Sequence, residues 1–143
     1  MAAHWRRLEA LYASAAINRL FPSVLTIVGE GRARIEASIG PEHFHAAGAA
    51  HGAVYFKVLD DAAFFAANSL VEDVFVLTTN FTVGLTRPLG PGQVVAEGTW
   101  TSGTRRTLFA EARLSDDAGA EVARGSGVFL RSRILLASLP GCA

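Results

Sequence analysis

The chain has 143 residues, of which 50% are hydrophobic and 18% are charged, and its 13 basic and 13 acidic side chains leave no net charge. So much apolar material can form a core, which argues against a disordered chain, and without a basic tract a nucleic-acid-binding surface is not expected. The length fits one domain spanning residues 1–143, and no apolar stretch reaches the roughly 18 residues of a membrane span.

The one cysteine, Cys142, stands near the C-terminal end and has no partner for an internal disulfide or a metal site. Glu9 follows Arg6 and Arg7 so closely that a secretory signal fits the N-terminus poorly. These features predict a cytoplasmic protein.

Two helices are predicted in the first half of the chain. Apolar residues recur at helical spacing over about residues 3–20, which predicts an amphipathic helix. A short β-branched run at 24–28 and an alternation of apolar and polar residues at 33–39 predict two strands, and a loop follows over 40–50. Residues 52–69 contain no proline or internal glycine and are apolar almost all round, so they predict a long buried helix.

The second half of the chain has the alternating pattern of strands joined by short turns. Four strands are predicted, at about 75–85, 94–100, 108–114 and 122–130. Gly125 and Gly127 in the last of them indicate a bulge or a close backbone approach. The order predicts an α+β fold in which an antiparallel sheet wraps one long central helix, with an additional N-terminal helix.

Two adjacent carboxylates, Asp60 and Asp61, lie on the predicted central helix. Lys57 can form an ordinary helical ion pair with either one. The two side chains point about 100° apart, so we expect them in different environments, Asp61 solvated beside Lys57 and Asp60 on an apolar stripe. An unpaired carboxyl there should have a raised pKa, which makes Asp60 a candidate base or nucleophile.

The start of this helix is the second candidate site. Free backbone N–H groups and the positive end of the helix dipole at Gly52 and Ala53 can stabilise an oxyanion, although Gly52 can equally serve only to shape the turn. Gly52 and Asp60 are about 12 Å apart along a helix axis. If both act on one substrate carbonyl, they must come from two subunits related by a two-fold axis.

The stretch from Gly48 to Asp60, GAAHGAVYFKVLD, resembles the G-x-x-H-G-G…D signature of hotdog-fold acyl-CoA thioesterases of the phenylacetate-degradation type. The segments 77–83, with Arg87-Pro88 after it, and 118–125 resemble the family's following strands, and the likeness covers about residues 20–132. It implies a hotdog core over about 21–132 and a homodimer or dimer of dimers, with active sites at the subunit interface. The implied reaction is hydrolysis of acyl-CoA or aroyl-CoA thioesters without a metal or other cofactor.

Carried over by position, the resemblance assigns chemical roles to five residues. Asp60 corresponds to the catalytic base or nucleophile, and the backbone of Gly52 and Ala53 corresponds to the oxyanion site. Thr78 corresponds to a hydroxyl that helps to hold the water. His45 stands where asparagine is common and can still donate a hydrogen bond.

Two of these positions depart from the family pattern. The methyl group of Ala53, where the family has its second glycine, crowds the acyl group, and the imidazole of His45 is larger than the amide of asparagine. These departures suggest an alternative, a non-catalytic acyl-CoA-binding or regulatory module. A hotdog dehydratase would need a different His–Asp or His–Glu motif, which the sequence lacks.

The remaining candidates concern substrate binding and metals. We expect His51 and Asp61 to contact the substrate and Arg105 and Arg106 to meet the CoA phosphates, although two arginines at a strand edge are as often only solvated. His43, His45 and His51 lie close in sequence but lack a matching acidic cluster, so no metal site is predicted.

Overall fold

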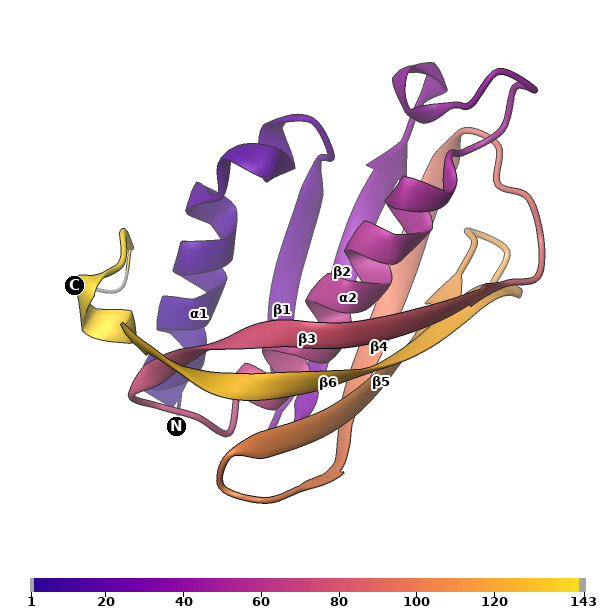
Figure 1. The fold of residues 1–143 in the computed structure, drawn as a ribbon. Helices are drawn as coiled ribbons and strands as arrows, with labels where there is room; N and C mark the ends of the chain where they lie inside the picture. The colour runs from indigo at the N-terminus through magenta and orange to yellow at the C-terminus, as the bar shows by residue number, and fades with distance from the viewer. Residues whose placement is uncertain (1, 142–143) are drawn as a thin grey trace.

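A computed structural model describes residues 2–141, which form a six-stranded antiparallel sheet, one long central helix and a shorter N-terminal helix (Figure 1). Cys142 lies outside the described residues. The helices are α1 (Ala2–Ser14) and α2 (Gly52–Asn68), with 3-10 turns η1 (Ala16–Arg19), η2 (Pro41–His43) and η3 (Leu136–Ser138). The strands are β1 (Ser23–Gly29), β2 (Arg32–Ile39), β3 (Val74–Leu85), β4 (Gly92–Gly103), β5 (Thr107–Ser115) and β6 (Glu121–Leu135).

The strand order is β1-β2-β4-β5-β6-β3, and every neighbouring pair is antiparallel. The sheet curves around α2, which packs against all six strands, and α1 covers β1 beside it (Figure 1). This confirms the predicted hotdog arrangement. The order leaves β1 and β3 as the two edges of the sheet. None of the helices in residues 2–141 is both long and apolar enough to cross a bilayer.

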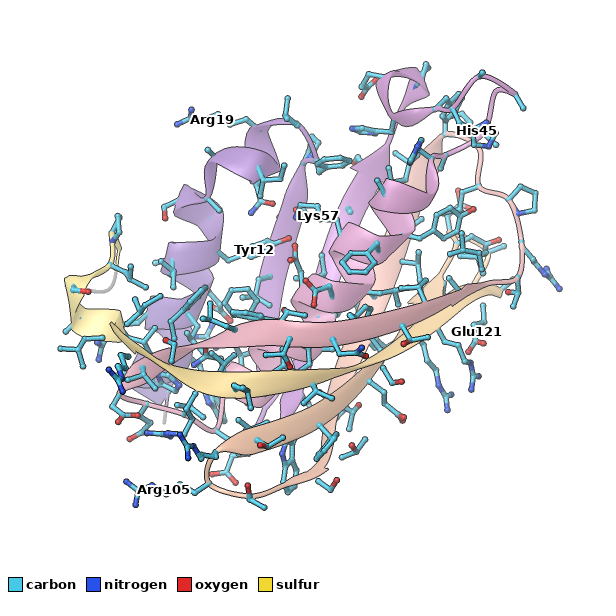
Figure 2. All side chains as sticks on the ribbon, in the orientation of Figure 1. Tyr12, Arg19, His45, Lys57, Arg105 and Glu121 are labelled. Atoms are coloured by element: carbon cyan, nitrogen blue, oxygen red, sulfur yellow. The ribbon has the colours of Figure 1, made fainter. Side chains whose placement is uncertain are left out.

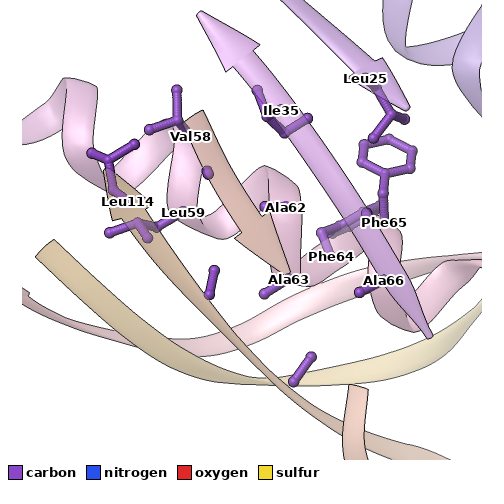
Figure 3. Close-up of a cluster of buried hydrophobic side chains, with 14 of the residues drawn as sticks. Leu25, Ile35, Val58, Leu59, Ala62, Ala63, Phe64, Phe65, Ala66 and Leu114 are labelled. Carbon is purple, nitrogen blue, oxygen red and sulfur yellow. The ribbon is translucent and has the colours of Figure 1, made fainter. Parts of the chain in front are cut away.

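Small residues let α2 approach the sheet very closely. Ala62, Ala63, Ala66 and Ala67 are fully buried, and Figure 3 shows three of them between the helix and the strands. On β4, a Cβ atom at Gly98 would lie 2.1 Å from the carbonyl oxygen of Ala62. Only glycine fits at this crossing, so the spacing between helix and sheet is set by backbone contact.

The N-terminal helix ends earlier than the predicted 3–20, because α1 stops at Ser14. Ala15 is extended, with φ −68° and ψ 128°. The carbonyl of Tyr12 accepts hydrogen bonds from the Ala15 N–H at 3.1 Å and from the Asn18 side chain at 2.7 Å. A side-chain amide thus caps one of the last carbonyls of the helix, and η1 follows in a new direction.

Strand β3 changes its inward face part-way along its length. Pairing with β6 is irregular between Thr78 and Asn80, which indicates a β-bulge. Strict alternation would place Thr78 and Phe81 on opposite faces, yet Thr78 reaches α2 and Phe81 packs against the core. The ring of Phe81 lies against Gly125 and Gly127, where added Cβ atoms would meet it at 2.7 and 2.4 Å. This is the close approach that the two glycines predicted.

Substitution of Gly98 by alanine should lower the free energy of unfolding by about 3 kcal/mol, because the new methyl group must push α2 off the sheet. Gly90→Ala is the matched control, since nothing lies within 4 Å of its added Cβ. Urea unfolding of both variants measures the difference. Equal stability of Gly98→Ala and wild type would contradict the close packing.

Candidate active site

Asp60 lies on α2 at the point where the helix enters the core. Its Oδ1 accepts a hydrogen bond from Thr78 Oγ1 at 3.0 Å, so the bulge in β3 gives this carboxyl a neutral hydroxyl partner. Burial raises the pKa of Asp60 to about 6, against the opposing effect of the Thr78 hydrogen bond, and the negative charge of Asp61 adds to the rise. The predicted raised pKa is confirmed. Near neutral pH the carboxylate is ionised and still basic enough to take a proton.

Asp61 is held in an ion pair on the side of α2 that faces α1. Lys57 Nζ lies 2.5 Å from Asp61 Oδ2, as predicted, and the Tyr12 hydroxyl donates to the same oxygen at 2.8 Å. The Asp61 and Lys57 side chains are only 22% and 11% exposed, so the expectation of a solvated Asp61 is wrong. Figure 2 shows Lys57 and Tyr12 pointing toward each other between the two helices.

A hollow of about 260 Å³ lies beside the two carboxylates, between α1, η1, α2 and β3. Both Asp60 and Asp61 line it, so the expectation that they face different spaces is wrong, although their hydrogen-bond and ion-pair partners differ. Adjacent side chains on a helix point about 100° apart, but this hollow is wide enough for both carboxylates to line it. The other lining residues are mostly apolar: Leu11, Tyr12, Ser14, Ala15, Ile17, Phe64, Phe65, Phe75 and Thr78.

The first turn of α2 offers one backbone donor to a ligand. The ring of His51 caps the helix, because its Nδ1 accepts the N–H of Ala53 at 2.9 Å. The N–H of Gly52 has no hydrogen-bond acceptor among residues 2–141. Of the two predicted oxyanion donors, Gly52 is therefore available and Ala53 is engaged by His51.

His45 and Gly52 line a second hollow, of about 290 Å³, at the start of α2. The His45 N–H donates to Ala49 O at 2.9 Å, and its Nδ1 accepts the N–H of Ala47 at 3.0 Å, so the ring is fixed within its own loop. The remaining lining residues come from this loop, α2 and the end of β3: Ala49, Ala50, Tyr55, Leu85, Thr86, Arg87 and Pro88.

The two hollows lie at opposite ends of β3 and are not brought together within one chain. Asp60 and Gly52 are eight residues apart on α2, about 12 Å along the axis. Phe56 stands midway between them on the same helical stripe and is 42% exposed, with its ring 5.4 Å from that of Phe81. The single chain therefore contains the two halves of the predicted site, separated by an exposed aromatic ring.

The remaining predicted residues lie apart from both hollows. Arg105 and Arg106 occupy the exposed turn between β4 and β5, and Figure 2 shows Arg105 at the opposite end of the molecule from His45. Within residues 2–141 neither arginine forms an ion pair. The ring of His43 is buried and bonds to Gly40 and Leu20, separately from the other two histidines.

A family comparison agrees with this geometry. Residues 47–123, more than half of the chain, match the family model of the thioesterase superfamily. The chain belongs to the thioesterase superfamily. The matched segment begins just before α2 and includes Asp60 and Thr78. No protein with a curated function matches the chain.

Solved structures show the same fold. The PaaI protein from the phenylacetic acid degradation operon of E. coli matches with a TM-score of 0.85 at 18% identity, over 94% of this chain and 96% of that protein. A variant of the phenylacetic acid degradation protein PaaI from Thermus thermophilus matches with 0.67 at 25% identity, over 76% and 93%. A thioesterase from Haemophilus influenzae matches with 0.77 at 14% identity, over 85% of each chain. This superfamily member thus has the expected hotdog fold.

The sequence did not predict that the N-terminal helix reaches the site. Five of the residues that line the hollow beside Asp60 belong to α1 and the segment after it. Sequence spacing could predict that Leu11 and Tyr12 lie on the buried face of a helix, but not that this face meets α2 at Asp60. Phe64 carried a clearer signal, since it follows Asp60 by one helical turn.

The two adjacent aspartates should respond in opposite ways to one substitution. Asp60→Asn should raise the unfolding free energy at pH 7 by about 1–2 kcal/mol, because it removes a carboxylate whose charge is disfavoured by burial. Since the pKa of Asp60 is higher in the folded than in the unfolded state, wild-type stability should fall as pH rises from about 4 to about 6. The gain of the variant should therefore disappear at pH 4.

Asp61→Asn, the matched control, should lower the unfolding free energy at pH 7 by about 2 kcal/mol, because Lys57 loses its counter-charge. Urea unfolding at pH 4 and pH 7 measures both effects. Destabilisation of equal size in the two variants would show that Asp60 is compensated as fully as Asp61.

Proposed function

We propose that this superfamily member hydrolyses acyl-CoA or aroyl-CoA thioesters to the free acid and CoA. The observation that carries the proposal is Asp60, an ionisable group with a pKa of about 6 at the edge of an apolar hollow. An acyl chain fits the hollow, and its thioester carbonyl then lies near the carboxylate. The neighbouring Thr78 hydroxyl supports the same assignment, because it can hold a water molecule beside Asp60.

In the proposed reaction the Asp60 carboxylate takes a proton from water, and the resulting hydroxide attacks the thioester carbonyl carbon. The tetrahedral intermediate collapses with cleavage of the C–S bond, and the CoA thiolate leaves and takes up a proton. Direct attack by Asp60 would instead give a mixed anhydride that water hydrolyses. Both routes need an ionised Asp60 and a donor for the carbonyl oxygen.

The donor is proposed to be the N–H of Gly52 of the partner subunit, in a homodimer or a dimer of dimers. Edge strand β3 presents unpaired backbone groups, and Leu77 and Leu85 on it are 44% and 51% exposed. Leu77 points away from α2, whereas Leu85 lies beside Gly52, so Leu85 and Phe56 are exposed apolar side chains on the α2 side of β3 that a second copy can cover. A two-fold axis near Phe56 places each Asp60 beside the opposite helix start.

Other contacts to the substrate are proposed at the rim. His45 and His51 flank the free N–H of Gly52 and can contact the thioester or the pantetheine arm. Arg105 and Arg106 have exposed guanidinium groups that can bind the CoA phosphates. The arginines can come from either subunit, depending on which one lies near the bound CoA.

A second candidate function is a non-catalytic acyl-CoA-binding or regulatory module. One observation favours it: the ring of His51 takes the Ala53 N–H, which leaves a single free donor for the oxyanion. The same hollow would then bind the acyl group without turnover. Measurement of CoA release separates the two functions.

The first activity prediction concerns Asp60. Asp60→Asn should lower kcat/KM for CoA release by about 100-fold or more, since a general base contributes about 10²–10⁴ to a rate. Asp117→Asn, the same change at an exposed position, should leave the rate unchanged. In the wild type, kcat/KM should rise with pH through about 6 and then level off, as Asp60 ionises. A flat profile, or an active Asp60→Asn variant, would remove Asp60 from the reaction.

The second prediction concerns the N–H of Gly52. Gly52 is the first residue of α2 and His51 is extended, so Gly52→Pro can remove the donor while keeping the helix. The loss of one oxyanion donor should lower kcat by about 10²–10³. Gly52→Ala keeps the N–H and has space for its methyl group, so it is the control.

Mixing the two inactive variants tests the shared site. A heterodimer of Asp60→Asn and Gly52→Pro chains contains one site with both groups intact, so activity should return to about half that of the wild-type dimer. Verified heterodimers without activity would place both groups in the site of a single chain. Binding of acyl-CoA without release by the wild type would favour the regulatory module.

A further inference from the structure

We propose that the segment Leu11–Ile17, which joins α1 to η1, is the wall that limits the size of the acyl group, so that this N-terminal segment sets substrate selection. This inference rests on the proposed function, because it assigns the hollow beside Asp60 to the acyl group. It adds a specificity determinant that lies outside the segment matched by the family model, residues 47–123.

The lining of the hollow carries the proposal. Opposite Asp60 and Thr78, the wall is made by Leu11, Tyr12, Ser14, Ala15 and Ile17, while Phe64, Phe65 and Phe75 form the remaining sides. Without this segment the hollow would be an open groove between α2 and β3. Ile17 stands at the rim and is 47% exposed, so a ligand can displace water from an apolar surface there.

The segment is fixed against α2 by a partly buried polar network. The Tyr12 hydroxyl contacts Asp61 Oδ2 at 2.8 Å and Ser23 Oγ at 2.9 Å, and the Tyr12 ring packs edge-on against Phe65 at 5.3 Å. Lys57 Nζ donates to Asn18 Oδ1 at 2.7 Å. The network links α1 and η1 to β1 and to the helix that carries Asp60. Asp61 and Lys57 are thus positioning residues for the wall.

Volume and charge define the acyl group that fits. A cavity of roughly 150 Å³ can hold a benzene-sized molecule, so the hollow of about 260 Å³ has room for a medium-sized acyl group. Its lining is hydrocarbon and aromatic except for the carboxylates and a few hydroxyls. An uncharged apolar acyl group is favoured, and an acyl group with its own carboxylate is disfavoured by repulsion from Asp60.

The test uses CoA thioethers, which lack the carbonyl and cannot be hydrolysed, with S-ethyl and S-hexyl groups. Ala15→Phe fills the hollow from the proposed wall. Ala16→Phe is the matched control, because Ala16 is exposed and does not line the hollow. Ala15→Phe should raise the Kd of S-hexyl-CoA tenfold or more and change that of S-ethyl-CoA less than twofold. Ala16→Phe should change neither. Calorimetric titration measures all four constants for comparison with the wild type.

Two more variants protect the test against a folding defect. Leu11→Ala enlarges the hollow, so it should lower the Kd of thioethers longer than hexyl relative to that of S-hexyl-CoA. An unfolded protein would not gain affinity for any of them. Tyr12→Phe loosens the wall, so it should raise KM for hexanoyl-CoA several-fold more than it raises KM for acetyl-CoA.

The outcomes distinguish the two proposals. If Ala15→Phe and Ala16→Phe have the same effect, or if Ala15→Phe weakens the binding of both thioethers equally, the proposal that this segment limits the acyl group is overturned. If the thioether constants change as expected but the wild type releases no CoA from hexanoyl-CoA, the wall stands and the hydrolase function is rejected.

Discussion

The rest of the structure depends on the contact between α2 and the sheet. Gly98 allows β4 to touch the backbone of α2 at Ala62, and the alanines that follow keep the helix at this distance along its second half. A helix held so closely cannot rotate to expose a polar face without breaking its packing. The positions of Asp60 and Asp61 at the entrance to the buried half are therefore fixed by the core.

This fixed placement gives two neighbouring carboxylates different electrostatic conditions within one hollow. Asp61 has a lysine and a phenol as partners, so its charge is balanced where it stands. Asp60 has the hydroxyl of Thr78 and the attraction of the Lys57 charge, which together do not offset the cost of burial, and its pKa rises to about 6. A paired carboxylate stabilises the fold, whereas an incompletely compensated one can take a proton, and the second condition makes Asp60 the better candidate for chemistry.

Sequence patterns predicted the elements well because their causes are local. Apolar patterns located the strands to within about three residues at each end, except that β6 continues to Leu135 beyond the predicted end at 130, and the absence of proline and internal glycine defined α2. The features that the sequence did not predict depend on distant contacts. The bulge near Thr78 depends on pairing with β6, and the end of α1 depends on Asn18 folding back onto the Tyr12 carbonyl. The apolar wall at Asp60 depends on the packing of α1 against α2, whose facing residues are more than 40 positions apart in sequence.

One stripe of α2 explains why catalysis and assembly belong together in the proposed dimer. Gly52, Phe56 and Asp60 follow each other at intervals of four residues and share one face of the helix. In the isolated chain this face has an unused N–H at one end, an exposed ring in the middle and a weakly compensated carboxyl at the other. In the proposed dimer, a partner helix running in the opposite direction would cover the ring, and the same contact would bring each carboxyl to an N–H. The stripe that stabilises the dimer would therefore also complete both sites, and neither role could be changed without affecting the other.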